Sequence, residues 1–127
     1  MSLADVRESV AAALRVGLDP DNSTVAPAPI DAWEGAPGFM VAWADPMLVV
    51  TGFCAFNARL LVHAIGPRID ADNGTAIVES LVEHAATQLA AINCPPRDVA
   101  APGPFEIGGV TYLGARITIE YPTKLEA

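Results

Sequence analysis

The stretch that decides the fold is FEIGGVTYLGARITIEYP, residues 105–122 in the last quarter of the chain. Its Gly108-Gly109 pair is typical of a tight hairpin turn. After the turn, apolar residues occupy every second position: Leu113, Ala115, Ile117, Ile119 and Tyr121. This alternation predicts a strand with one buried face. We therefore expect residues 104–122 to form a closing hairpin whose second strand joins a sheet built from the preceding chain.

The middle of the chain supplies the rest of the predicted sheet. Phe39–Trp43 favours a short strand, and after Asp45-Pro46 a strand-like run extends from Met47 to Ile65, with a bulge or turn at Thr51-Gly52 and an end at Gly66-Pro67. One face of this run is entirely apolar: Cys54, Phe56, Ala58, Leu60, Val62 and Ala64. Residues 18–38 are rich in Asp and Pro. Because proline cannot donate a ladder hydrogen bond, we expect this segment to be a loop or an edge strand.

Two stretches predict helices. Residues 2–16 begin with Ser2 and Asp5 at capping-box spacing and stop before Gly17, which suits a left-handed helix end. A second helix is expected from residues 72–75 to about residue 93, where Pro95-Pro96 forbids continuation. Its predicted buried stripe is Val78, Leu81, Val82, Ala85, Leu89 and Ile92. The order of elements predicts one α+β domain over residues 1–127, with two helices on one face of an antiparallel or mixed sheet of about four to five strands.

The composition narrows the class of protein. The chain has 127 residues, 15 acids, 7 bases and a net charge of -8. A surface that grips nucleic acid needs clustered Lys and Arg, so direct nucleic-acid binding is not expected. Hydrophobic residues make up 52% of the chain and the mean hydropathy is +0.36, which indicates apolar surface covered by a partner. We expect no membrane span and no secretory leader, because apolar runs are short and charges interrupt the N-terminus.

Candidate catalytic groups are sparse. His63 and His84 lack further residues at metal-ligand spacing, and Ser80 and His84 are helical neighbours without an evident oxyanion hole. The glycines match turns rather than a phosphate-binding loop. Cys54 is expected to be a small core residue, although a disulfide with Cys94 stays possible. We therefore expect no catalytic, cofactor or metal site, and no enzyme.

Five residues are candidates for an interface. Arg59, Arg116 and Glu120 fall on the polar faces of their strands, together with Tyr112. If the helices cover one sheet face, these side chains lie on the other and form a protein interface. The alternative is a solvated face with a cross-strand ion pair. Trp33, in the Pro-rich loop, is either part of a lid over the core or an anchor for a partner.

This order of elements resembles the tail terminator proteins of long-tailed bacteriophages. The stretches that carry the resemblance are residues 25–29 with Trp33, the strand from Cys54 to Val62, the helix from Ile77 to Ile92, and residues 107–117. The Ala-, Pro- and Asp-rich composition is similar to that of phages of high-GC actinobacterial hosts.

The resemblance implies a structural role. Such proteins form a six-fold ring on the head-proximal end of the tail tube, end tail polymerisation and join the tail to the head. The expected partners are further copies of the chain, the tail tube protein and a head-neck connector protein, with DNA passing through an acidic lumen. The expected location is the virion, after assembly in the host cytoplasm. Two alternatives stay open: another neck or head-completion protein, and a small cytoplasmic binding module for a hydrophobic ligand.

Overall fold

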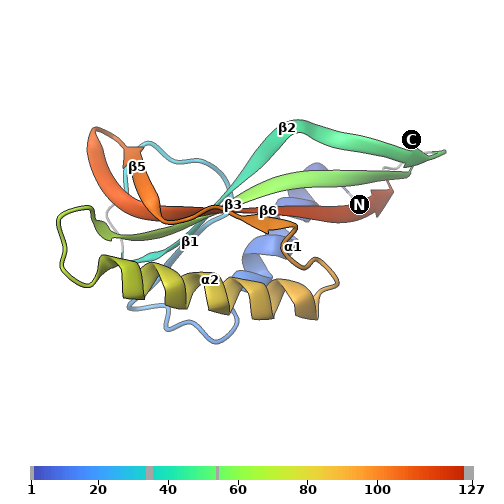
Figure 1. Ribbon diagram of the computed structural model, residues 1–127. Coiled ribbons are helices and arrows are strands. Elements are labelled where there is room, and N and C mark those ends of the chain that lie inside the picture. The colour runs from blue at the N-terminus through green and yellow to red at the C-terminus, as the bar shows by residue number, and fades with distance from the viewer. Residues whose placement is uncertain (1, 34–35, 54, 125–127) are drawn as a thin grey trace.

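The computed structural model describes residues 2–33, 36–53 and 55–124, and it is an α+β fold with two helices on one face of a mixed sheet (Figure 1). The helices are α1 (Leu3–Arg15) and α2 (Gly74–Ala91). The strands are β1 (Thr24–Ala26), β2 (Gly38–Gly52), β3 (Ala55–Arg68), β4 (Asp98–Val99), β5 (Gly103–Ile107) and β6 (Val110–Lys124). The predicted fold class is confirmed. The sheet has six strands, whereas about four to five were predicted, because the two-residue β4 was not expected.

Local chemistry sets both ends of α1, and the buried face of α2 follows its sequence pattern. The Ser2 hydroxyl accepts a hydrogen bond from the Asp5 N–H, and the Asp5 carboxylate accepts one from the Ser2 N–H, so the predicted capping box is formed. Gly17 follows α1 with a φ of +81°. The buried face of α2 contains Gly74, Val78, Leu81, Ala85 and Leu89, in agreement with the predicted stripe.

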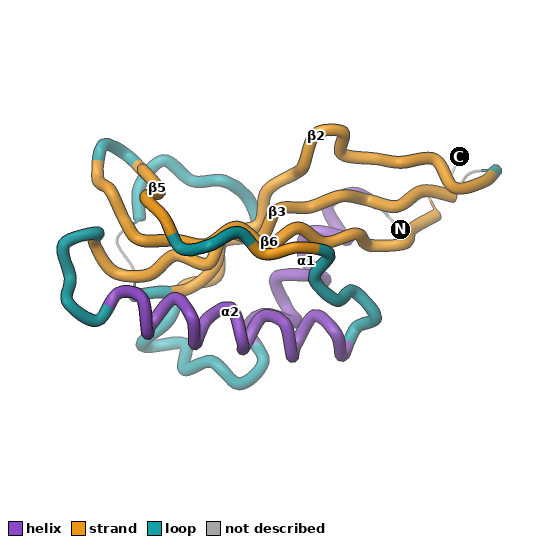
Figure 2. Tube along the Cα trace, viewed as in Figure 1, coloured by secondary structure: helices purple, strands orange, loops and turns teal. Residues whose placement is uncertain are grey.

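The sheet has the order β1-β2-β3-β6-β4, with β5 paired to the outer side of β6 (Figure 2). β1 is parallel to β2, and the other pairs are antiparallel. β1 lies at the edge of the sheet, which confirms the expectation for the Pro-rich segment. Gly108 and Gly109, both with positive φ, form the turn of the closing hairpin as predicted.

Two predicted boundaries in the middle of the chain, at Asp45-Pro46 and at Gly66-Pro67, were wrong. β2 continues through Asp45-Pro46, and a register shift against β3 between Trp43 and Leu48 takes up the interruption. The predicted bulge or turn at Thr51-Gly52 is confirmed, since the register of β2 against β3 shifts between Val50 and Gly52 and β2 ends at Gly52. β3, however, extends past Gly66-Pro67 to Arg68. β2 therefore joins the predicted short strand to the first part of the predicted long run, and β3 is the second part of that run. Asp45-Pro46 does not end the strand, because residues on both sides of Pro46 pair with β3 and a bulge accommodates the proline.

The main core lies between the helices and the sheet. It contains Val41, Leu60, Val62, Ile117 and Ile119 from the three central strands, and fully buried residues of both helices pack on them. The alternation predicted for residues 113–121 is confirmed, since Ala115, Ile117 and Ile119 are buried. Cys54, expected in this core, lies outside the described residues.

The three central strands continue past the helices as a projection, whose base includes the buried Ala58 of the main core. In Figure 1 the ends of β2, β3 and β6 extend to the right, past both helices. The strand register pairs Leu48, Val49 and Val50 with residues 56–58 of β3, which in turn pair with residues 121–123 of β6. We call this three-stranded projection, residues 47–53, 55–58 and 121–124, the arm.

Candidate interaction surface

The predicted interface residues of β3 and β6 lie on the sheet face opposite the helices. Since Leu60, Val62, Ile117 and Ile119 point into the core, the residues between them point the other way. Arg59 is opposite Glu120 in the register, and His63 is opposite Arg116. Tyr112 is on the same face, nearer the hairpin turn. We call this surface the helix-free face.

The ion pair on the helix-free face is not the cross-strand pair between Arg59 and Glu120 that the register would allow. Glu120 pairs with Arg97, with 2.9 Å between Nε and the carboxylate oxygen, although Arg59 is its register partner. The Arg59 guanidinium donates instead to the Pro46 carbonyl oxygen at 3.2 Å. Arg97 is held beside β6 because its N–H donates to the Thr118 carbonyl oxygen. The sequence could not reveal this partner, since β4 and the residue before it are brought to β6 by tertiary pairing.

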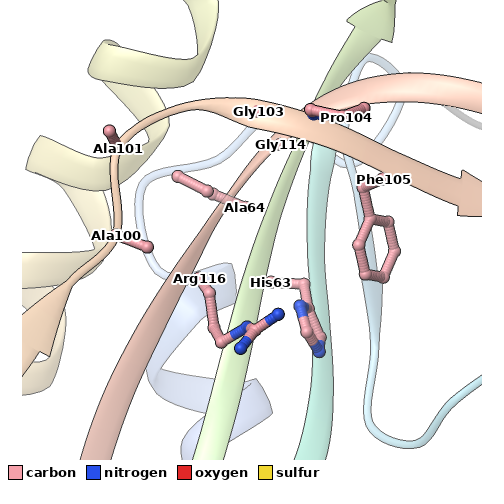
Figure 3. A pocket seen from close by; sticks show the side chains of 10 residues that line it. His63, Ala64, Ala100, Ala101, Gly103, Pro104, Phe105, Gly114 and Arg116 are labelled. Carbon is pink, nitrogen blue, oxygen red and sulfur yellow. The ribbon is translucent and has the colours of Figure 1, made fainter.

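A pocket of about 270 Å³ opens on this face beside β5 (Figure 3). The Phe105 ring packs against the His63 ring in a tilted arrangement, with 4.6 Å between centroids, and the exposed Arg116 side chain lies next to His63. Burial lowers the pKa of His63 from its ordinary value of 6.5, and the Arg116 charge lowers it further. Both effects favour the neutral form of His63, beside the Arg116 guanidinium.

Trp33 is part of a lid. Its side chain is only 6% exposed and packs with Ala26, Met40, Ile65 and Ile107 in a second apolar cluster. The Tyr112 hydroxyl donates to the Trp33 carbonyl oxygen at 2.7 Å, which fastens the loop to the closing hairpin. The Trp33 side chain thus packs within the subunit and offers little surface to a partner. The geometry favours the lid over the alternative, an anchor for a partner.

The sequence reasoning missed the exposed apolar tip of the arm. Phe53 is 97% exposed, Val50 is 70% exposed and Val49 is 39% exposed. The signal that could have found it is the absence of charge from Pro46 to Ala58, between Asp45 and Arg59. An exposed uncharged run on an acidic protein indicates an interaction site.

The groups considered for catalysis have structural partners. His84 Nε2 lies 3.0 Å from the Leu14 carbonyl oxygen, and its ring stacks on Phe39. The Cys94 thiol donates to the Glu120 carbonyl oxygen, and burial raises its pKa to about 11. Within residues 2–33, 36–53 and 55–124, no three His, Cys, Asp or Glu side chains gather as a metal-binding group. No helix in the same ranges is long and apolar enough to cross a membrane.

Comparison with known proteins adds no identification. The chain matches no protein-family model, and it has no significant match among curated proteins.

Proposed function

We propose that this chain is a structural virion protein that forms a ring at the head-proximal end of a phage tail tube. In this role it ends tail polymerisation and joins the tail to the head. The resemblance in the order of elements is the starting point, and the fold class agrees with it.

The observation that carries the proposal is the arm with its exposed apolar tip. A side chain such as Phe53, 97% exposed at the end of a three-stranded projection, is unfavourable in an isolated subunit and favourable where a neighbour covers it. An assembly in which subunits cover one another's apolar surface accounts for both the arm and the high apolar content.

The helix-free face supplies a second surface, of different chemistry. It carries Arg59, Tyr112 and Arg116 with the Arg97–Glu120 ion pair, a mixture suited to a polar contact with a different protein. We assign this face to the tail tube or connector protein. An Arg116→Glu variant should keep the fold, because the side chain is exposed, and should lose incorporation into particles.

Two alternative functions make different demands. Another neck or head-completion protein would use the same surfaces at a different position of the particle. A binding module for a hydrophobic ligand would need an enclosed apolar pocket, whereas the pockets beside His63 and beside Trp33 are open to solvent.

Electron microscopy of particles from a phage with a stop codon in this gene tests the proposal. Overlong tail tubes detached from filled heads are the expected result. Normal-length free tails beside leaking heads would indicate head completion instead. Normal virions would rule out a structural role.

A further inference from the structure

We propose that the pocket between β4 and β5 on the helix-free face binds a carboxylate group of a partner protein. The pocket has a volume of about 270 Å³, and the His63 ring and the Arg116 side chain lie in it side by side (Figure 3). The residues of the pocket carry the choice of a carboxylate, whereas the identity of the partner, a tail tube or connector protein, rests on the function proposed above.

The outer edge of β6 has a gap in its pairing at this pocket. β4 pairs with β6 as far as Ile117, and β5 pairs with it from Gly114 to the hairpin turn, so neither strand pairs with residues 115–116. The Ala100 N–H donates to the Arg116 carbonyl oxygen at 2.8 Å. Because the N–H and C=O of one residue in an antiparallel strand point to the same side, the Arg116 N–H also faces the gap. Among the described residues no carbonyl oxygen accepts a hydrogen bond from it, so it is available to a ligand.

Arg116 supplies the positive charge of the pocket. Its side chain is exposed, and among the described residues no acid pairs with it, since the ion pair on this face joins Arg97 to Glu120. The residues that line the pocket include no acid, although the chain has 15 acids and 7 bases. A concave site with a cation and no acid attracts anions. A guanidinium binds a carboxylate through two parallel N–H···O bonds.

His63 forms a polar wall of the pocket. Burial and the charge of Arg116 lower the pKa of His63, which favours the neutral ring. A neutral imidazole still carries one N–H and can donate it to a carboxylate oxygen. A carboxylate bound beside the ring would favour the imidazolium, so binding should raise the pKa of His63. The imidazole is therefore both a contact and a reporter.

The size and charge of the pocket favour a carboxylate over a larger or more highly charged anion. Sites for whole small molecules measure about 300–1,000 Å³, so a pocket of about 270 Å³ suits a single group. Among the described residues that line it, Arg116 alone carries a full charge in the neutral-imidazole form. One guanidinium compensates one negative charge. A phosphate dianion would bring further charge to a chain that already carries -8.

Two glycines keep the pocket open. Gly103 and Gly114 pair across β5 and β6, and both line the pocket. A Cβ at Gly114 would lie 3.0 Å from the Ala64 carbonyl oxygen and 3.3 Å from the Phe105 Cβ, whereas a Cβ at Gly103 would meet only the Ala101 carbonyl oxygen, at 4.0 Å. The backbone therefore tolerates a side chain at Gly103. Since Gly103 lies on the helix-free face, that side chain would fill the pocket.

NMR titration of the full-length protein with short peptides tests the site. The probes are acetyl-Ala-Glu-Ala-amide, its Gln counterpart as the uncharged control, and acetyl-Ala-Ala-Ala with a free terminal carboxylate. At constant ionic strength we expect saturable shifts of the Arg116 amide and the His63 imidazole with both carboxylate peptides, a rise in the pKa of His63, and no saturable shift with the Gln peptide. The tighter of the two carboxylate peptides identifies whether an acidic side chain or a chain end is preferred.

Three variants separate the pocket from the overall charge of the chain. Arg116→Gln should weaken binding of the Glu peptide by about tenfold or more, because it removes the bidentate contact. Gly103→Leu should weaken it similarly by filling the pocket while every charge is kept. Arg68→Gln removes the same charge at an exposed position of β3 outside the pocket, and it should bind like the unmodified protein.

The failures are equally defined. Equal shifts with the Glu and Gln peptides, or none with any peptide, would overturn the proposal. So would equal losses in Arg116→Gln and Arg68→Gln, which would show a general charge effect. Tighter binding of inorganic phosphate than of the carboxylate peptides would overturn the preference for a carboxylate.

These results are separable from the phage experiment. A terminator phenotype in the stop-codon phage without peptide binding would keep the proposed function and remove this site from it. Specific peptide binding with normal virions would keep the carboxylate site and remove the function.

Discussion

His84 connects three parts of the molecule through one side chain. Its Nε2 lies 3.0 Å from the Leu14 carbonyl oxygen at the end of α1, while its ring stacks on Phe39 of β2. Replacement by Ala leaves a part-buried carbonyl oxygen without this partner, which costs about 1–3 kcal/mol. We expect His84→Ala to lower the free energy of unfolding by that amount in urea titrations.

Thr87→Ala is the control for this prediction. The Thr87 hydroxyl donates only to the Glu83 carbonyl oxygen of the same helix, at an exposed position. Its removal should change stability by less than about 0.5 kcal/mol. Equal unfolding midpoints for the two variants would show that the His84 contact is not stabilising.

The pKa of His63 is a second prediction at this scale. Burial lowers it from 6.5, and the charge of Arg116 contributes. Arg116→Gln removes the positive neighbour, so the pKa of His63 should rise while staying below its ordinary value. Titration of the imidazole protons by NMR measures this. An unchanged pKa would mean that burial alone is responsible.

The same shift has a consequence for stability. Because the folded-state pKa lies below 6.5, the unfolded chain binds the proton first as the pH falls. Stability from neutral His63 is therefore complete above pH 6.5 and is lost as the pH falls through the folded-state pKa. Arg116→Gln should reduce this loss.

Among the elements, the closing hairpin also positions the loop that carries Trp33. Gly108 has a φ of +57°, and a Cβ there would collide with the Asp31 carbonyl oxygen. Gly109 has a φ of +81°, but a Cβ there would meet no atom within 4 Å. Gly109→Ala should thus cost only the left-handed strain, about 1–2 kcal/mol. Gly108→Ala should cost more, since it also displaces the loop.

Thermal unfolding of the two variants checks this difference. A lower melting temperature for Gly108→Ala than for Gly109→Ala is expected, together with a change in tryptophan fluorescence in the first variant. If the two variants melt together, the loop does not depend on its contact with the hairpin turn.

Elements with strong local signals could be predicted from the sequence, and those fixed by distant pairing could not. The capping box of α1 and the alternation in β6 depend on residues a few positions apart. The continuation of β2 through Pro46 depends on β3, so Asp45-Pro46 was misinterpreted as an end. The alternation of apolar residues predicted that Arg59 and Arg116 lie on the helix-free face. The ion pair between Glu120 and Arg97 could not be predicted, because it depends on the pairing of β4 with β6.

At the scale of the whole molecule, charge and apolar surface are separated. The acids are distributed along the chain, while the arm segment from Pro46 to Ala58 has none. Long-range repulsion between copies therefore opposes association, and short-range burial of the arm tip favours it. The balance between the two depends on ionic strength.

This balance gives a prediction about salt. The Debye length falls from about 30 Å at 0.01 M to about 10 Å at 0.1 M ionic strength, so added salt screens the repulsion between subunits of charge -8 and leaves apolar contact intact. Self-association of the full chain, measured by sedimentation, should strengthen over this range. Phe53→Asp should stay weaker than the unmodified protein at both salt concentrations, because it removes the apolar contact and adds an acid to the tip. Association that weakens as salt is added would mean that ion pairs, such as those available to Arg116 on the helix-free face, hold the subunits together instead of the arm.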